Sequence, residues 1–221
     1  MSRRSLTILL LSAIALLALV FVAYPRLNSR LAKVRATPPG QSSMSTLERT
    51  WVNYEEKVKE VAEEYDLPAN YLLALIVLET GGHHPAGKRY EPGVFRRLKN
   101  VQSGKRLRYE SVRRKHLKDA SDEAIRNLAT SWGPFQLMGY KCIAMDITVN
   151  DLRSDDAVEY GAEWISEEYG HLLRKGRYKD AFHYHNTGRV YPKVGAPRTH
   201  DPKYVSKGLG YMDYFKKKLG E

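Results

Sequence analysis

The stretch Tyr71-Leu-Leu-Ala-Leu-Ile-Val-Leu78, followed by Glu79-Thr-Gly-Gly82, decides the fold of this chain. The eight residues of its first part are apolar around the whole helical wheel, which is typical of a helix buried on all sides. Pro68 stands just before it, where the first turn of a helix tolerates proline. The two glycines end it. The sequence therefore predicts a central buried helix that carries a carboxyl group at its C-terminal end.

Amphipathic patterns on both sides of this helix predict further helices. Ser45-Thr-Leu-Glu48 fits a capping box at the start of one helix. Ser121 can cap a short helix through Thr130, Ser154 can cap a longer one, and residues 178–184 form another helical piece. Apolar stripes at helical spacing are Trp51, Tyr54, Val58, Val61 and Tyr65; Val158, Ala162, Ile165, Tyr169 and Leu172; and, after Pro202, Val205, Leu209, Met212, Phe215 and Leu219. Without an alternating strand pattern or an internal repeat, the expected fold class is mainly α.

The chain begins with an appendage that is expected to anchor it in a membrane. Two arginines precede residues 6–23, an uncharged apolar run close to the roughly 20 residues that a spanning helix needs. We therefore predict a signal anchor over residues 1–24, a linker over 25–45 and one folded domain over 46–221. A cleaved signal peptide is the alternative.

The charge and the cysteine count narrow the possible partners and chemistry. A formal net charge of +11 predicts attraction to nucleic acid, anionic lipid or an acidic cell wall. Residues 83–120 are basic, low in apolar content and hard to assign, which in a compact domain is usual for a functional or mobile segment. Cys142 stands alone, so no intramolecular disulfide can form and a small buried side chain is expected.

Glu79 is the most informative single position. Burial and the negative end of the helix dipole both disfavour its charged form, so its pKa should be raised. A glutamic acid that stays protonated near neutral pH can protonate a leaving sugar oxygen, as glycoside cleavage requires. The plainer interpretation is a helix-end residue that reaches solvent.

Four segments together resemble one protein family. They are Leu78-Glu-Thr-Gly81, Gly133-Pro-Phe-Gln-Leu-Met138, Tyr184-His-Asn-Thr-Gly188 and Lys203-Tyr-Val-Ser-Lys207. Their order over residues 67–219 resembles the soluble lytic transglycosylases and their goose-type lysozyme relatives. The resemblance implies a single lysozyme-like catalytic domain. His185 and Thr80 depart from the family's usual Tyr and Ser, and the segment between Glu79 and Gly133 looks more like variants in phage-associated murein-cleaving enzymes.

The resemblance also implies roles for particular side chains. Glu79 would be the catalytic acid, and Gln136 would line the sugar-binding cleft beside it, since a carboxamide can both donate and accept hydrogen bonds. Asn186 would lie beside the scissile bond, and Tyr204 would help position Glu79. Tyr184 is expected at the substrate as well. Capping for Gln136 and Asn186, and ordinary core packing for Tyr204, are the alternatives.

Two mechanisms remain open at such a site. The resemblance implies cleavage of the β-1,4 bond from N-acetylmuramic acid to N-acetylglucosamine in peptidoglycan. In a lytic transglycosylase, one Glu acts as acid and then as base and a 1,6-anhydro ring closes, with no cofactor. A muramidase instead needs a second carboxylate, either about 6.5–9.5 Å away to activate water or about 5–5.5 Å away as a nucleophile. Glu91 is the best candidate, unless it only pairs with nearby arginines, and the transglycosylase is favoured. The expected location is the inner membrane with the catalytic domain in the periplasm, or export if the anchor is cleaved.

Other classes of function have weaker signals. The cations of residues 96–118, with Tyr109 among them, could contact phosphates, but no nucleic-acid motif accompanies them, so no nucleic acid is expected. A non-catalytic wall-binding module is a further alternative. His183 and His185 are two residues apart, and the chain has no HExxH or paired-cysteine pattern, so no metal site is expected. A bacterial and a phage role both remain open.

Overall fold

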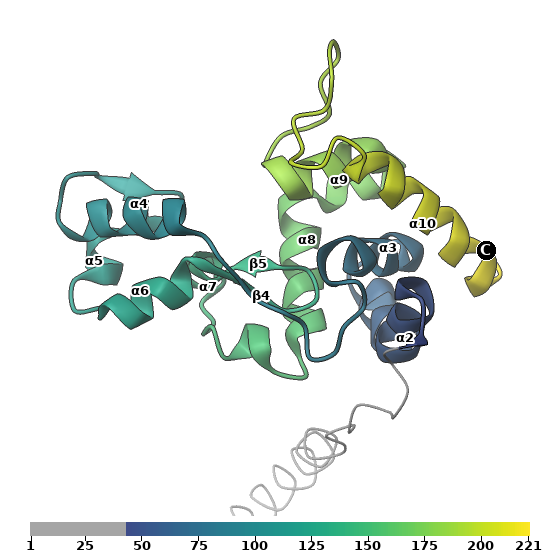
Figure 1. Cartoon of the computed structure of the whole chain (residues 1–221), viewed down its shortest axis with the longest axis horizontal. Helices are drawn as coiled ribbons and strands as arrows, with labels where there is room; N and C mark the ends of the chain where they lie inside the picture. Colours follow the sequence, from purple (N-terminus) through teal and green to yellow (C-terminus); the bar gives the residue numbers. More distant parts are fainter. Residues whose placement is uncertain (1–42) are drawn as a thin grey trace, which may run out of the picture. The chain divides into compact units, whose positions relative to one another are not determined.

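The computed structural model describes residues 43–221. Helices dominate it, as predicted, and they form two lobes joined by a small sheet (Figure 1). We call "large lobe" the set α2 (Thr46–Glu64), α3 (Ala69–Thr80), α8 (Ala157–Leu173), α9 (Tyr178–Thr187) and α10 (Tyr204–Leu219). We call "small lobe" the set α4 (Pro92–Gln102), β2 (Arg108–Tyr109), β3 (Val112–Arg113), α5 (Arg114–Leu117) and α6 (Asp122–Leu128).

Helix α3 is the centre of the large lobe, which confirms the prediction from its sequence. Residues 70–77 are all buried, and α2 and α10 pack against this helix. Pro68 is the N-cap residue rather than part of the first turn. Gly81 closes the helix in the left-handed region at φ 60°. A Cβ on Gly82 would lie 2.5 Å from the backbone nitrogen of Thr50, so only glycine allows this close approach to α2.

Two other large-lobe helices have predicted N-cap residues, and the prediction is confirmed for one of them. The capping box of α2 is present: the Ser45 hydroxyl accepts from the amide of Glu48 at 3.2 Å, and the Ser45 amide donates to the Glu48 carboxylate at 3.1 Å. The N-cap of α8 is Asp156, so the prediction for Ser154 was wrong. A short 3-10 helix, η3 (Asp151–Arg153), precedes it, and the Ser154 hydroxyl instead accepts from the amide of Asp156 at 3.2 Å.

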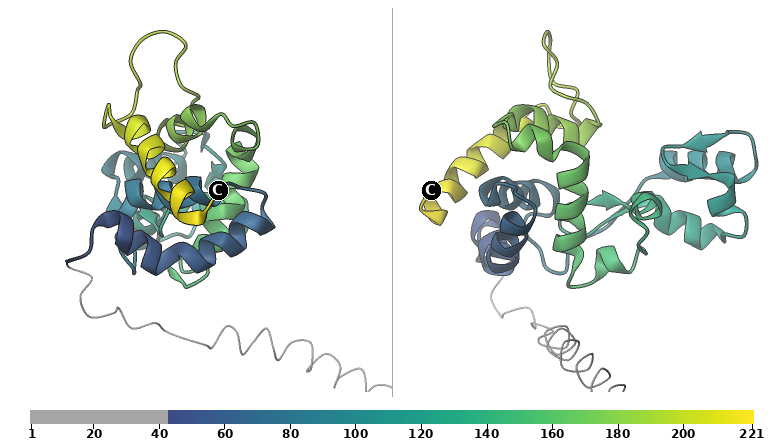
Figure 2. Two further views of the ribbon diagram at one scale, coloured as in Figure 1. Left: turned by 90° about the vertical axis from the view of Figure 1, so that its right-hand side faces the viewer. Right: turned by 180° about the vertical axis from the view of Figure 1, so that it is seen from behind.

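The predicted apolar stripes supply the core of the large lobe. Most of their members are buried, and the rest, Trp51, Tyr65, Leu209 and Leu219, are partly buried against the same core. Helix α9 continues three residues beyond the predicted end at Tyr184, and Gly188 closes it at φ 70°. Figure 2 shows α10 running across one side of this helical group, from the protruding loop after α9 to the C-terminus.

Most of the small lobe lies in residues 83–120, to which the sequence analysis assigned no element. Its core consists of Leu98, Val101, Val112, Leu117, Ile125, Ala129 and Tyr140, all buried. Ser121 caps α6 by accepting from the amide of Ala124 at 3.1 Å, as predicted. The helix ends at Leu128, however, because Thr130 already belongs to a strand.

A three-stranded antiparallel sheet joins the lobes, in the order β1 (Arg89–Tyr90), β4 (Thr130–Trp132) and β5 (Leu137–Met138). Strands of two or three residues are too short to show alternation, which is why the sequence did not predict them. Two short helices, η2 (Gly139–Lys141) and α7 (Cys142–Met145), follow β5. Cys142 is buried, as predicted, and burial raises the pKa of its thiol to about 12.

The predicted anchor over residues 1–24 and nearly all of the linker over 25–45 lie outside the described residues. Within residues 43–221, no helix is both long and apolar enough to cross a membrane.

Candidate functional site

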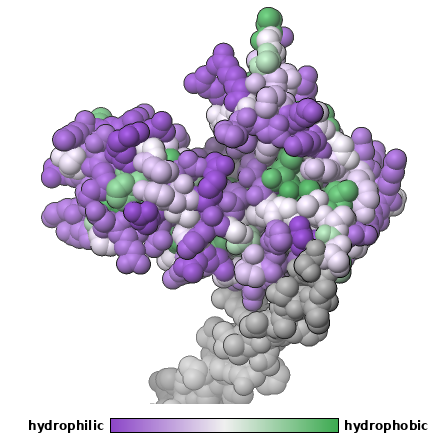
Figure 3. All heavy atoms as spheres, in the orientation of Figure 1, coloured by the Kyte–Doolittle hydropathy of each residue, from purple (hydrophilic) through white to green (hydrophobic). Residues whose placement is uncertain are grey.

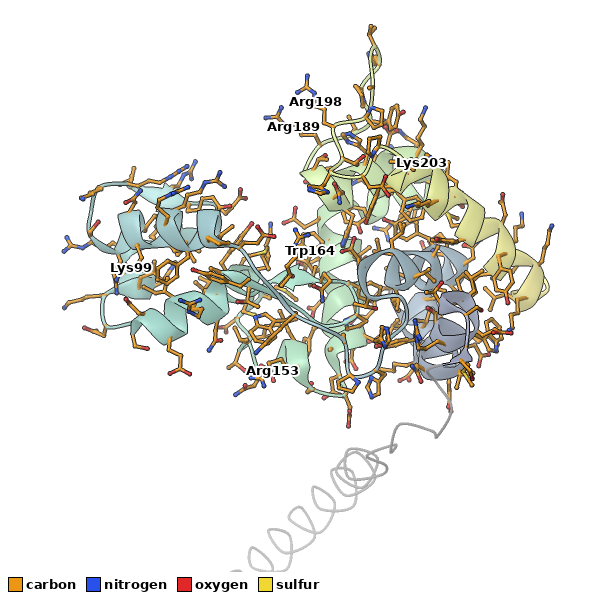
Figure 4. All side chains as sticks on the ribbon, in the orientation of Figure 1. Lys99, Arg153, Trp164, Arg189, Arg198 and Lys203 are labelled. Carbon is orange, nitrogen blue, oxygen red and sulfur yellow. The ribbon has the colours of Figure 1, made fainter. Side chains whose placement is uncertain are left out.

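A cleft of about 640 Å³ lies between the two lobes. The small lobe and the segment after the sheet contribute Arg97, Tyr109, Glu110 and Tyr140, and the large lobe contributes Trp164, Glu168, Tyr184, His185, Asn186 and Arg189. Figure 3 shows the surface hollowed between the lobes, with hydrophilic residues along both sides. Trp164 lies at the base of this region and Arg189 above it (Figure 4).

Glu79 is the penultimate residue of α3, at the C-terminal helix end where the sequence placed it. Its side chain is 17% exposed. The buried hydroxyl of Tyr204, at the start of α10, donates a hydrogen bond to its Oε1 atom. Burial and then the charge of Glu79 hold the pKa of Tyr204 well above its usual range, so this hydroxyl remains a donor. Helices α3 and α10 therefore hold the carboxyl group in place.

His185 is the second neighbour of Glu79. Its Nε2 atom lies 3.8 Å from Glu79 Oε1 and 3.0 Å from the carbonyl oxygen of Phe135. Because a carbonyl only accepts, Nε2 carries the hydrogen, and Nδ1 accepts from the hydroxyl of Tyr169 at 2.8 Å. Burial lowers the pKa of His185, so we assign the neutral ring. The neutral imidazole of His185 therefore interacts with the Glu79 carboxyl group through its N–H dipole, and the two groups do not form an ion pair.

A chain of hydroxyl groups fixes this imidazole from behind. Tyr71 of α3 donates to the Tyr169 hydroxyl at 3.2 Å, and Tyr169 in turn donates to His185. Both tyrosines are fully buried, and burial holds the pKa of Tyr169 well above its usual range. The sequence predicted Tyr169 only as a core residue. Its hydroxyl partner could not be foreseen, because helices α8 and α9 meet only in the folded state.

The cleft reaches Glu79 through His185. Glu79 itself is not among the lining residues, whereas His185 lines the cleft and contacts the Glu79 carboxyl group. The hydroxyl of Tyr184 donates to Glu168 across the same wall at 3.4 Å. The carboxyl group is therefore at the edge of the cleft, with most of its side chain enclosed by protein.

Trp164 is a cleft residue that the sequence analysis missed. It is 8% exposed, and its Nε1 atom has no hydrogen-bond partner among residues 43–221. The ammonium group of Lys141 lies 5.2 Å from its ring centre, and the ring of His185 meets it edge-on at 5.9 Å. The sequence offered one signal for this residue: Trp164 stands next to Ile165 but does not belong to the apolar stripe of α8.

Gln136 lines the cleft, but its carboxamide is engaged by the protein. Its oxygen accepts from the Ser131 hydroxyl at 2.8 Å, and its nitrogen donates to the carbonyls of Gly87 and Gly133 at 2.7 and 3.0 Å. Its backbone has a φ of 51°, in the left-handed region. Gln136 thus ties the segment before β1 to the turn between β4 and β5.

The remaining predicted site residues separate into two groups. Tyr184 and Asn186 line the cleft, and Asn186 is exposed near the C-terminal end of α9. Glu91 does not line it: its carboxylate lies 2.5 Å from the guanidinium of Arg89, at the N-cap of α4. The structure therefore favours the plainer interpretation of Glu91. The acidic residues that do line the cleft are Glu110 and Glu168.

The histidines of α9 serve the protein's own hydrogen bonding. His183 contacts the carbonyl oxygen of Arg189, and His185 contacts that of Phe135. Within the described range, no group of three or more His, Cys, Asp or Glu side chains is placed to hold a metal ion.

Comparison with known proteins adds no family assignment. A scan against protein-family models, a search of curated proteins and a search of solved structures each found no match. A function can therefore be proposed only from the motifs of the chain and from the geometry of this cleft.

Proposed function

We propose that this protein is a peptidoglycan lytic transglycosylase with a lysozyme-like domain. It would cleave the β-1,4 bond between N-acetylmuramic acid and N-acetylglucosamine. The observation that carries the proposal is the enclosed Glu79 carboxyl group at the end of a buried helix, held by Tyr204 at the edge of a cleft between two lobes. This arrangement joins the four sequence motifs in one place.

In the proposed reaction, Glu79 first gives its proton to the leaving glycosidic oxygen as the bond to the anomeric carbon breaks. The carboxylate then takes the proton of the C6 hydroxyl of the muramic acid, whose oxygen closes the 1,6-anhydro ring. No water is consumed, and Glu79 returns to its starting state. The Tyr204 hydroxyl would stabilise the carboxylate between the two steps, because it donates to Oε1.

The surroundings of Glu79 favour this route over hydrolysis. Its two polar neighbours are a tyrosine hydroxyl and a neutral imidazole, and Glu91 is paired with Arg89. A hydrolase needs a second carboxylate to activate water or to act as nucleophile. An N-acetylmuramidase on the same domain is the alternative, and Glu110 and Glu168 would then be the candidates because they line the cleft.

The aromatic lining of the cleft is consistent with a glycan strand as the ligand. Tyr109, Tyr140, Trp164 and Tyr184 line the cleft, and aromatic side chains with a polar tip suit both the apolar faces and the hydroxyl groups of sugars. Tyr109 and Tyr184 are partly exposed there, whereas Tyr140 and Trp164 are buried. On the small lobe, the guanidinium groups of Arg97 and Arg106 lie 5.6 and 5.5 Å from the ring centre of Tyr109. The proposed location is the inner membrane, through residues 1–24, with the domain in the periplasm.

The test is digestion of purified peptidoglycan by the full chain, with mass spectrometry of the released sugars. We expect products that end in 1,6-anhydro-N-acetylmuramic acid, and we expect Glu79→Gln to abolish them while the fold is retained. Glu64→Gln is a matched control, because Glu64 is an exposed glutamate at the C-terminal end of α2. Release by Glu79→Gln would refute the mechanism. Reducing ends would establish the muramidase, and no release by the wild type would favour a non-catalytic wall-binding module.

A further inference from the structure

A second hollow adjoins the cleft at the C-terminal end of α9. It has a volume of about 540 Å³, and its lining residues are Asn186, Thr187, Arg189, Arg198 and His200. We call it the arginine annex. Asn186, Thr187 and Arg189 also line the cleft, so the two spaces share one wall. No lining residue of the annex is acidic.

A buried histidine brings the two arginines together. His183 is 1% exposed, and its Nδ1 atom lies 2.7 Å from the carbonyl oxygen of Arg189. Its Nε2 atom accepts from the backbone amide of Arg198 at 3.1 Å. Because the carbonyl requires a donor and the amide requires an acceptor, one ring satisfies both ends of the loop that leads from Arg189 to Arg198. The loop is therefore closed at its base by a core residue.

Further contacts keep the backbone at the base of this loop in place. The Thr187 hydroxyl accepts from the amide of Arg189 at 3.2 Å, and the Tyr191 amide donates to Asp180 at 3.1 Å. On the other side, the hydroxyl of the buried Thr199 donates to the carbonyl of Asp201 at 2.7 Å. Figure 4 shows the side chains of Arg189 and Arg198 on the same side of the molecule, to the left of the protruding loop.

The guanidinium groups of Arg189 and Arg198 differ from those of Arg177 and Arg89, which are paired with carboxylates. Arg177 pairs with Asp180 at 2.7 Å, and Arg89 pairs with Glu91 at 2.5 Å. Among residues 43–221, no carboxylate or other side chain bonds to the guanidinium of Arg189 or Arg198. Two cations that line one hollow, on a fixed backbone and without a carboxylate partner, are suited to an anionic group of a ligand.

We propose that the arginine annex binds a carboxylate of the peptide that the muramic acid units of the strand carry. This inference rests on the proposed function, because cleavage beside muramic acid places that sugar, and hence its peptide, next to Glu79. A planar guanidinium matches a carboxylate with two parallel hydrogen bonds, and two guanidinium groups can hold one carboxylate from both sides. The annex therefore makes the enzyme prefer strands that bear peptides over bare glycan.

The test compares two substrates with the full chain. One is peptidoglycan strands with their peptides, and the other is the same strands after an amidase has removed the peptides. We expect a higher kcat/KM on the peptide-bearing strands, and we expect Arg198→Gln or Arg189→Gln to lower the ratio of the two kcat/KM values about tenfold. Lys217→Gln is the matched control, since it removes the same charge at an exposed position of α10 and should keep the ratio.

Binding to Glu79→Gln separates this inference from the proposed function. The dissociation constants of tetrasaccharide fragments with and without peptides are measured for this variant and for its double variant with Arg198→Gln. A preference for the peptide-bearing fragment that Arg198→Gln removes supports the annex, even if no cleavage occurs. If neither binding nor cleavage distinguishes the two substrates, or if Lys217→Gln lowers the ratio equally, the annex proposal is refuted, while loss of cleavage in Glu79→Gln would still support the enzyme.

Discussion

The two lobes are stabilised in different ways. The large lobe is built on α3, a helix with no exposed face over residues 70–77, and even its buried hydroxyl groups are paired, as in Tyr71 and Tyr169. The small lobe has a smaller core. Cationic side chains pack on its aromatic residues, and the guanidinium of Arg126, for example, lies 4.4 Å from the ring centre of Tyr90. The large lobe has the continuous packing that precise positioning of a reacting group requires.

The proposed chemistry follows this difference. Glu79, Tyr204 and His185 all come from large-lobe helices, whereas the small lobe contributes cleft-wall residues such as Arg97 and Tyr109. A carboxyl group that must transfer a proton to one atom needs fixed neighbours. A cleft wall can tolerate movement, and it would have to move if long strands are to enter and leave. Under the proposed function, the large lobe would therefore hold the reacting group in place and the small lobe would supply one wall of the cleft.

The largest expected effect is the loss of unfolding free energy when a buried leucine of either core is truncated. Leu75→Ala in α3 and Leu117→Ala in the small lobe should each cost about 2–5 kcal/mol, because both side chains are fully buried. We expect hydrogen exchange to accelerate throughout residues 46–221 for Leu75→Ala, but only over residues 92–128 for Leu117→Ala. Equal acceleration in α3 for Leu117→Ala would mean that the two lobes unfold as one unit.

The second prediction concerns the hydroxyl group that holds Glu79. Tyr204→Phe should lower kcat about 10- to 100-fold, because a hydrogen bond to a charged group contributes about 1.5–3 kcal/mol. Tyr54→Phe is the control, since its buried hydroxyl donates to the carbonyl of His83 instead, at 2.6 Å. We expect the control to lose stability in urea unfolding but to keep its kcat. Equal losses of kcat would assign the effect of Tyr204 to general stability.

The third prediction uses the pH dependence of large-lobe stability. Burial lowers the pKa of His185 in the folded protein, whereas the unfolded chain has the ordinary value near 6.5. Below that value the unfolded state binds more protons, so the contribution of neutral His185 is complete above pH 6.5 and is lost as the pH falls through the folded pKa. The free energy of unfolding should therefore fall more between pH 7.5 and pH 5 in the wild type than in His185→Gln. An equal fall would contradict the assignment of a neutral ring.

The smallest effect compares helix caps in the two lobes. Ser45→Ala and Ser121→Ala should each cost about 1 kcal/mol, since both hydroxyls accept from a backbone amide at an N-cap. The cost of Ser121→Ala should appear as faster exchange within α6, because this helix has only seven residues. Ser103→Ala is the control: its hydroxyl donates to a carbonyl of its own helix, and its loss should change stability by less than about 0.5 kcal/mol. A global shift for Ser121→Ala would argue against an independently opening small lobe.

The sequence by itself determined the elements whose signals are local. A helix with apolar residues on every face, a capping box and long apolar stripes each follow from neighbours within a few turns, so α2, α3, α8, α9 and α10 were predictable. In the small lobe only α6 was predicted, from its N-cap Ser121. Strands of two residues and a helix of four carry too few positions for a period, and the eleven-residue α4 was missed in a segment rich in basic residues. The start of α8 was predicted at the wrong residue, because Ser154 lies at the C-terminal end of η3 and the N-cap of α8 is Asp156.

Only the tertiary structure decided what surrounds the proposed catalytic carboxyl group. The helix-end position of Glu79 could be read from the sequence, and the resemblance led us to expect Tyr204 beside it, which the hydrogen bond to Oε1 confirms. The second neighbour, His185, lies more than a hundred residues away along the chain and was not expected there. Glu91 was a candidate by proximity along the chain, and its pairing with Arg89 became visible only from the position of α4. The annex depends likewise on His183, which joins two loop ends. Local patterns specify helices because their hydrogen bonds are local, whereas a cleft is formed by side chains from distant segments that meet only when the core has closed.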